Sequence, residues 1–277
     1  MSNIVFLTAI TFPGQEKRSE PYQYGIKTWS KWCKKNNCEL FVLDEPIFDP
    51  NFCKPNFYRY WAFDLLETND IKYDQICIVD ADTMIHPDCP NFFEESNNNF
   101  GVVINNGDWE WVLRSIKQWG DNLFSNESKI KPWKYFNSGF IVVNKKHKSF
   151  FDIVKEYYTK NMSVIKELDK KIKAGTDQTI INYLTQQNNI QLEYMPECYN
   201  LQDLSKKNLL RPSENEGYTT IDSIKNHWKP NFLKAGWIYH FNAITQEDKD
   251  IVKTMSRTIP DIFKEEWMAT TYNFLNR

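Results

Sequence analysis

The sequence has 277 residues, of which 41% are hydrophobic and 25% charged, a composition typical of a globular protein with a sizeable core. A net charge of −2, without any basic cluster interleaved with aromatic residues, excludes the basic face of a nucleic-acid-binding protein. No apolar run reaches the roughly 18 residues that a transmembrane helix needs, so we expect no membrane span. We expect a cytoplasmic protein because we interpret its cysteines, discussed below, as reduced thiols.

The first part of the chain alternates between strand and helix patterns. Short apolar runs predict buried strands at 3–11, 38–44 and 73–85. Apolar residues at helical spacing predict helices between them, at 22–36 and 56–67. The first run lacks the charged and long apolar regions of a signal peptide, and we interpret it as a strand. The alternation predicts a parallel, doubly wound arrangement, which binds its ligand at the carboxyl ends of the strands.

The second part is less regular, and its elements complete an α/β protein with a mixed, Rossmann-like sheet flanked by helices. A polar, tryptophan-rich connection separates the first two of its strands. The predicted strands lie at 99–106, 136–145, 190–196 and 236–243, the helices at 147–162 and 176–187, and a helical tail at 247–277. No repeat or linker divides the chain, so we expect a single domain over 1–277. Its six cysteines show no metal-binding spacing, and we expect reduced thiols.

The apolar strand predicted at 73–85 carries two carboxylates, Asp80 and Asp82, at positions i and i+2. Side chains at this spacing on an extended segment point the same way, so the two charges repel unless a cation lies between them or one holds a proton. Hard divalent ions prefer oxygen ligands and bridge carboxylates to phosphate oxygens. The pair predicts a divalent-metal site that also holds a diphosphate, and a solvated turn or helix cap is the alternative.

Four stretches, in this order, resemble glycosyltransferase family 8, the glycogenin and galactosyltransferase group with a GT-A fold. "YDQICIVDADTMI" (73–85) is similar to its metal-binding strand, and "FNSGFIVVNK" (136–145) to its "FNSG" strand. "GTDQTIINYL" (175–184) is similar to its "GDQ" segment, and "YHFNA" (239–243) to its "HF" strand. With the first strand, the resemblance spans roughly residues 3–245. It implies a GT-A fold and a hexosyltransferase that retains the configuration of the donor sugar.

The resemblance also implies a division of the domain and a bound metal. Residues 1–105 would form the nucleotide-binding half, 106–246 the donor-sugar and acceptor half, and 247–277 a helical tail. Mn²⁺ or Mg²⁺ would bind to Asp80, Asp82 and His240. A neutral imidazole is a suitable ligand for such an ion, and a hydrogen-bonded buried histidine is the alternative. His86 and His147 lie in no comparable pattern, and we expect structural roles for them.

The expected donor is a nucleotide-sugar, with UDP as the usual carrier in the family that the chain resembles. Arg59 matches a basic helix position that faces the diphosphate, and a surface charge is the alternative. The backbone at Ala81 would approach the ribose. The nucleotide base would lie against the end of the first strand, at Thr8, Ala9 and Ile10.

Residues near the starts of 136–145 and 176–187 would surround the donor sugar. Asn137 and Ser138 can donate and accept hydrogen bonds, and Gly139 permits a close approach of the backbone. Asp177 and Gln178 would be catalytic, with Asp177 stabilising an oxocarbenium-like transition state or orienting the donor. The alternative is that Asp177 or its preceding residue only caps the helix that follows.

The sequence is less informative about the acceptor, which the resemblance implies to be a carbohydrate or glycoconjugate. Trp109, Trp111 and Trp119 lie in the connection between two strands that should flank the site. Trp111, Ser115 and Trp119 would share one helical face, which is typical of a core, and stacking of an acceptor sugar is the alternative. No feature indicates the oligomeric state.

One departure from the resembling family concerns diphosphate binding. The family's "HF" strand is followed by glycine and then Lys-Pro-Trp, whereas this chain continues "HFNAITQEDK". The Lys-Pro pair in 227–232 precedes the histidine, so its position does not match that of the diphosphate-binding lysine. Lys249 follows the histidine and could replace that lysine, but only its nearness in sequence suggests this.

Two other functions fit parts of the pattern. A phosphatase of the HAD type also has DxDxT after an apolar strand, with the first aspartate as nucleophile. That motif normally follows the first strand, however, and the later lysine and acidic pair of such enzymes are not evident. The other alternative is a non-catalytic protein that binds sugar nucleotides or glycans.

Overall fold

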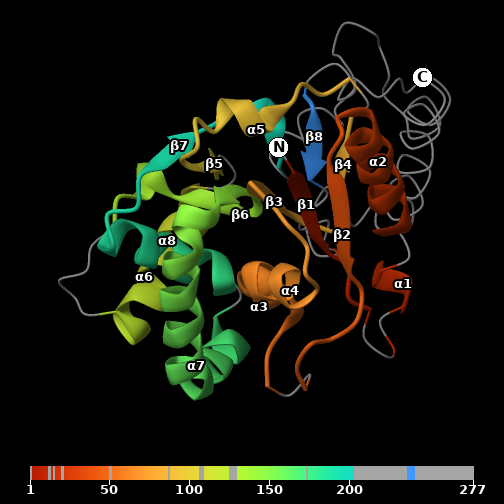
Figure 1. Cartoon of the computed structure of the whole chain (residues 1–277). Coiled ribbons are helices and arrows are strands. Elements are labelled where there is room, and N and C mark those ends of the chain that lie inside the picture. Colours follow the sequence, from red (N-terminus) through yellow and green to blue (C-terminus); the bar gives the residue numbers. More distant parts are fainter. Residues whose placement is uncertain are drawn as a thin grey trace, which may run out of the picture.

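The structure, a computed structural model, describes residues 2–11, 14, 16–19, 22–49, 52–86, 88–105, 109–124, 130–172, 174–202 and 236–240 (Figure 1). Its strands are β1 (Asn3–Thr8), β2 (Glu39–Leu43), β3 (Gln75–Asp80), β4 (Thr83–Ile85), β5 (Phe100–Ile104), β6 (Phe136–Asn144), β7 (Leu192–Tyr194) and β8 (Ile238–His240). Its α-helices are α1 (Glu16–Ser19), α2 (Tyr22–Lys35), α3 (Pro55–Tyr58), α4 (Ala62–Thr68), α5 (Phe92–Glu95), α6 (Trp109–Leu123), α7 (Lys148–Lys171) and α8 (Thr176–Gln187). Short 3₁₀ turns η1 (Arg59–Trp61), η2 (Pro132–Lys134), η3 (Lys145–His147) and η4 (Glu197–Tyr199) complete them.

A six-stranded mixed sheet with the order β2-β1-β3-β6-β5-β7 forms the centre of the molecule. The parallel arrangement expected for the first three strands is confirmed, because β1 pairs in parallel with both β2 and β3. β6 runs antiparallel to both of its neighbours, β3 and β5. The expected mixed α/β fold is therefore confirmed, with β6 as the reversed strand in the described sheet.

The predicted strand at 73–85 is wrong in one respect, because it is two strands. β3 ends at Asp80, a turn follows, and β4 pairs antiparallel with β8 in a separate two-stranded sheet. The Thr83 hydroxyl donates to the Asp80 carbonyl oxygen at 2.6 Å, which closes the turn. This pairing brings His240 opposite Thr83 in register, although the two are far apart in the sequence.

The predicted helices at 22–36 and 176–187 are confirmed, whereas two others differ in extent. The one at 56–67 is interrupted by η1, and the one at 147–162 continues to Lys171. The tryptophan-rich connection contains α6, in which Ser115 and Trp119 are buried as expected of a core face. The predicted tail at 247–277 lies outside the described residues. No helix in the described part of the chain is apolar over a length that could cross a bilayer.

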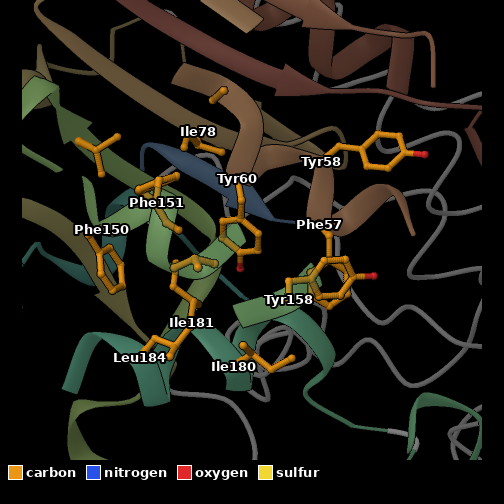
Figure 2. Packing of buried hydrophobic residues seen from close by; sticks show 14 of the residues in the cluster. Phe57, Tyr58, Tyr60, Ile78, Phe150, Phe151, Tyr158, Ile180, Ile181 and Leu184 are labelled. Carbon is orange, nitrogen blue, oxygen red and sulfur yellow. The ribbon is translucent and has the colours of Figure 1, made fainter. Parts of the chain in front are cut away.

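The core has two clusters, one on each face of the sheet, because side chains alternate along each strand. On β1, Ile4 and Phe6 belong to one cluster, whereas Val5 and Leu7 belong to the other. The first cluster lies beneath α7 and α8, where Phe57 stacks on Tyr158 with ring centroids 3.8 Å apart (Figure 2). The burial of these aromatic rings fixes α3 and η1, and with them the position of Arg59.

Helix α2 covers the other face and holds the turn after β3. Trp29 donates its indole N–H to the Thr83 hydroxyl at 2.9 Å, and Trp32 packs against Phe92. Gly25 is the point of closest approach, since a Cβ there would lie 2.5 Å from the carbonyl oxygen of Thr83 and 2.8 Å from that of Ala81. The turn that carries Asp82 therefore rests directly on the backbone of α2.

We expect Gly25→Ala to destabilise the fold although alanine is the better helix former. The gain in helix propensity is about 1 kcal/mol, but the added methyl meets backbone carbonyls that cannot rotate away, and overpacking of this kind costs about 1–3 kcal/mol. The free energy of unfolding, measured with denaturant, should fall. Ser30→Ala on the exposed side of α2 is the control and should be neutral or stabilising. Equal stability of Gly25→Ala and wild type would show that the contact is not tight.

Candidate active site

One edge of the sheet gathers the ends of strands that are far apart in the sequence. Asp80 ends β3 directly opposite Thr8, which ends β1. Since β6 runs the other way, it starts where β3 ends, and Val79 pairs with Phe140. Asn137, Ser138 and Gly139 therefore lie beside Asp80 at this edge.

Asp80, Asp82 and His240 form a cluster that fits a divalent metal ion. One ligand atom from each lies within 4.8 Å of the others, and His240 Nε2 is 3.5 Å from Asp80 Oδ2 and 3.3 Å from Asp82 Oδ1. Burial raises the pKa of Asp80, and Asp82 adds to this effect, while the positive charge of Arg59 opposes it. Two carboxylates and an imidazole are a suitable donor set for Mn²⁺ or a similar hard to borderline ion.

Arg59 is a buried cation between two carboxylates, so the alternative of a surface charge is wrong. Its Nη2 donates to Asp80 Oδ1 at 2.5 Å, and its Nε lies 3.6 Å from Asp177 Oδ2. Nη1 donates to the carbonyl oxygen of Ser138, and Nε donates to that of Asn56 at 2.7 Å. Burial alone would lower the pKa of Arg59. The neighbouring carboxylates of Asp80 and Asp177 raise this pKa by more than burial lowers it, so the guanidinium stays charged.

Asp177 is buried, and both of its carboxylate oxygens accept hydrogen bonds. Oδ1 accepts from the Asn56 amide at 2.6 Å and from the Thr176 hydroxyl at 3.2 Å. Oδ2 accepts from the hydroxyls of Tyr60 at 3.2 Å and Ser138 at 3.3 Å. The helix α8 has Gly175 at its N-cap and no side-chain cap, so the alternative of a simple capping role is wrong. Asp177 instead joins α3, η1 and β6 at the site.

Two polar atoms at this edge are buried without a hydrogen-bond partner in the described structure. One is the side-chain nitrogen of Gln178, whose oxygen accepts from the backbone N–H of Ser138 at 3.1 Å. The other is the Thr8 hydroxyl oxygen. A buried polar group without a partner is costly, and such groups at the edge of a sheet are typical of a ligand site.

The remaining predicted residues lie at the same edge. Ala9 and Ile10 directly follow β1, and the side chain of Ala81 is buried in the turn. Gly139 lies against the cluster of Asp80, Asp82 and His240, since a Cβ there would be 2.2 Å from His240 Cε1 and 2.6 Å from Asp80 Oδ2. The structure thus connects most of the predicted residues by direct contacts, whereas Ala9 and Ile10 are placed only by their position after β1.

Sequence reasoning missed Asn56 and Tyr60, which hold Asp177, and Asn200, which contacts His240. Asn56 and Tyr60 flank Arg59 in "NFYRYW", and the helical spacing of Asn56 and Arg59 was a usable signal. Nothing in the sequence around Asn200 indicates its contact. His86 and His147 are buried structural residues as expected, because each ring accepts a backbone N–H at Nδ1, from Asp88 and Asn144 respectively.

The residues discussed for acceptor and diphosphate binding are only partly described. Trp119 is buried, and its indole N–H donates to the Ala174 carbonyl oxygen at 2.6 Å, so it is a core residue. Trp109 is 49% exposed at the start of α6. The Lys-Pro segment at 227–232 and Lys249 lie outside the described residues.

Comparison with known proteins shows the fold. No protein-family model matches the chain, and no curated protein sequence matches it. Among solved structures, a glycosyltransferase involved in glycosylation of the major capsid of PBCV-1 superposes with a TM-score of 0.51 at 12% identity, over 87% of this chain and 94% of that one. The galactosyltransferase LgtC, in complex with donor and acceptor sugar analogues, superposes with a TM-score of 0.51 at 13% identity, over 98% and 96%. The chain therefore has a glycosyltransferase fold, as the resemblance to GT-A enzymes implied.

Replacing Arg59 by leucine should cost about 3–5 kcal/mol of unfolding free energy, because it leaves two buried carboxylates without their cation. The matched control is Arg114→Leu, which removes an exposed i,i+4 pair with Glu110 and should change stability by no more than about 0.5 kcal/mol. Denaturant unfolding of both variants measures the difference. A cost for Arg59→Leu as small as that of the control would contradict the buried bridge.

Proposed function

We propose that the protein is a metal-dependent glycosyltransferase that moves a hexose from a nucleoside-diphosphate sugar, with UDP as the carrier, to a hydroxyl of a glycan or glycoconjugate. The convergence of Asp80, Asp82 and His240 at one edge of a glycosyltransferase fold is the observation that carries this proposal. The pair of acidic residues alone is a weak signal. A third ligand, supplied by β8 from the far end of the described chain, supports a metal site much more strongly.

In the proposed reaction, the bond between the anomeric carbon and the diphosphate oxygen breaks, and the acceptor oxygen forms the new bond to that carbon and releases its proton. A divalent ion held by Asp80, Asp82 and His240 would offset the charge that develops on the diphosphate. Arg59 opposes the effect of burial on the pKa of Asp80 and orients this carboxylate for its role through a 2.5 Å hydrogen bond. We further propose that the configuration of the donor sugar is retained.

Asp177 and Gln178 take different roles in this proposal. The oxygens of Asp177 are occupied by neighbouring donors, so it positions Arg59, Tyr60 and Ser138. The oxygen of Gln178 is held by the Ser138 backbone, and its side-chain nitrogen is buried without a full hydrogen bond, although it lies close enough to the Tyr135 hydroxyl to offset part of the rise that burial causes in the pKa of that group. That amide can donate to a hydroxyl of the donor sugar. The Thr8 hydroxyl at the end of β1 is available to the nucleotide in the same way.

Two alternatives remain distinct from this proposal. A phosphatase would use Asp80 as the nucleophile, but Asp80 Oδ1 accepts from a buried arginine and its other oxygen faces a histidine. A transferase releases a nucleoside diphosphate, a phosphatase releases inorganic phosphate, and a binding protein releases neither.

Thermal unfolding with nucleotides tests the donor site directly. At ligand concentrations about 100 times Kd, binding stabilises the folded state by about 2.7 kcal/mol, which raises the Tm by roughly 5–10 °C for a chain of this size. We expect this rise with UDP and UDP-sugars only when Mn²⁺ is present. A rise without metal, or none with any nucleotide, would contradict the proposed site.

Asp82→Asn should abolish the Mn²⁺-dependent rise in Tm with UDP while the Tm without ligand changes little, because Asp82 is half-buried and lies in a turn. Asp88→Asn is the control, since Asp88 is an exposed carboxylate close in sequence and pairs with Lys35. It should leave the rise intact. An undiminished rise in Asp82→Asn would exclude this residue as a ligand.

Gln178→Ala and Asp177→Asn should affect turnover differently. Gln178→Ala removes a donor to the sugar and leaves the network around Arg59 in place, so we expect kcat to fall about 10-fold or more. Because it also leaves the buried Ser138 backbone N–H without its acceptor, it should cost about 1–3 kcal/mol of stability. Asp177→Asn disturbs five contacts and should lower both kcat and Tm. Steady-state kinetics and thermal unfolding measure the two effects, and an unchanged kcat in folded Gln178→Ala would contradict its proposed role.

A further inference from the structure

A chain of hydrogen bonds leads from the backbone of β6, through two asparagine side chains, to His240. The backbone N–H of Gly139 donates to Asn137 Oδ1 at 2.8 Å. The Asn200 amide nitrogen donates to the same oxygen at 3.1 Å, and Asn200 Oδ1 lies 3.0 Å from His240 Nδ1. Asn137, Asn200 and His240 are all buried, so water cannot readily substitute for any of these contacts.

The direction of every bond in this chain follows from its first member. A backbone N–H can only donate, so the Asn137 atom that it meets must be the oxygen. Asn200 must then present its NH₂ to that oxygen, which turns its own oxygen toward His240. An amide oxygen can only accept, and therefore the hydrogen must be on His240 Nδ1. Neither asparagine can flip without placing two donors or two acceptors in contact.

We propose that Asn137 and Asn200 are positioning residues that fix His240 as the Nδ1–H tautomer and so present its Nε2 lone pair to the metal site. This inference rests on the metal site of the proposed function. Nε2 then faces Asp80 Oδ2 and Asp82 Oδ1 at 3.5 and 3.3 Å, an arrangement that a cation between the three groups stabilises. A metal-binding histidine commonly donates its other ring N–H to an acceptor of this kind, which sets both the tautomer and the ring orientation.

Two further observations support this assignment. The ring of His240 packs closely against the backbone at Gly139, where a Cβ would lie 2.2 Å from Cε1, so this contact also restrains the position of the ring. His86 and His147, in contrast, each accept a backbone N–H at Nδ1 and must carry their hydrogen on Nε2. The described structure therefore contains both tautomers, and only the histidine at the proposed metal site has its Nε2 free of hydrogen.

Nitrogen NMR of the ¹⁵N-histidine-labelled full chain, without metal and at a pH where the ring is neutral, tests the tautomer directly. We expect His240, identified by its loss in His240→Asn, to show a protonated Nδ1 and a pyridine-type Nε2. His86 and His147 should show the reverse and serve as internal references. An Nε2–H tautomer for His240 would overturn the proposal. This result does not depend on catalysis or on the metal, and it requires only that His240→Asn folds so that the signal can be assigned.

The effect on the metal is measured by titrating Mn²⁺ and following the free ion by electron paramagnetic resonance. Loss of a residue that orients a metal ligand typically weakens affinity about 10–100-fold, and we expect this for Asn200→Leu and Asn137→Leu. Asn137→Asp keeps an acceptor for both donors, so it should bind Mn²⁺ more tightly than Asn137→Leu. Asn144→Leu, a buried asparagine at the opposite end of β6, is the control for general destabilisation and should keep the wild-type affinity.

The outcomes separate this proposal from the proposed function. Wild-type affinity for Mn²⁺ in folded Asn200→Leu would overturn the positioning role while leaving the metal site intact. Failure of the wild-type protein to bind Mn²⁺ would instead remove the metal site, and with it the purpose proposed for the tautomer. An equal loss of affinity in Asn144→Leu would show that the effect is only structural.

Discussion

The bridge that Arg59 makes between Asp80 and Asp177 is the interaction on which the site depends. A carboxylate at the end of a buried strand is costly unless a cation or several donors compensate it. Arg59 compensates Asp80 at the end of β3 and Asp177 in the first turn of α8, and it also donates to the backbone of β6. Because the guanidinium is planar and its donors are fixed in direction, it sets the distance between β3, β6 and α8 as well as their charge. Its own position is set by the aromatic core around Phe57 and Tyr60 (Figure 2).

The reversed strand β6 explains why one edge of the sheet holds so many polar groups. In a purely parallel sheet, this edge would receive only the carboxyl ends of the strands. Since β6 starts here, the segment Asn137–Gly139 contributes side chains and a close backbone approach at the same place. The pairing of β8 with β4 then brings His240 next to Asp80 and Asp82. The geometry of the cluster of Asp80, Asp82 and His240 is thus a consequence of strand order and direction.

Much of the fold was predictable because it depends on local patterns. Strands β1 and β2 and helices α2 and α8 follow from apolar periodicity, and Asp80 and Asp82 stood out as paired charges after an apolar run. The break between β3 and β4 was missed because no glycine or proline marks it, and the turn is closed instead by the Thr83 side chain. Asn200 was missed for a related reason, since its role depends on a contact between segments that only the folded chain brings together. The burial of Arg59 likewise could not be predicted, because the neighbouring residues are a mixture of polar and aromatic types that indicates no buried helix face.

The most direct test of the central claim is the release of nucleoside diphosphate from sugar nucleotides by the purified protein, with Mn²⁺ and with a chelator. Slow transfer to water should occur even when the natural acceptor is absent, so the assay does not require the acceptor to be known. The account predicts release of UDP from a UDP-sugar that stops when the metal is removed. Release of inorganic phosphate from a phosphate ester, with no nucleoside diphosphate formed from any sugar nucleotide, would contradict it.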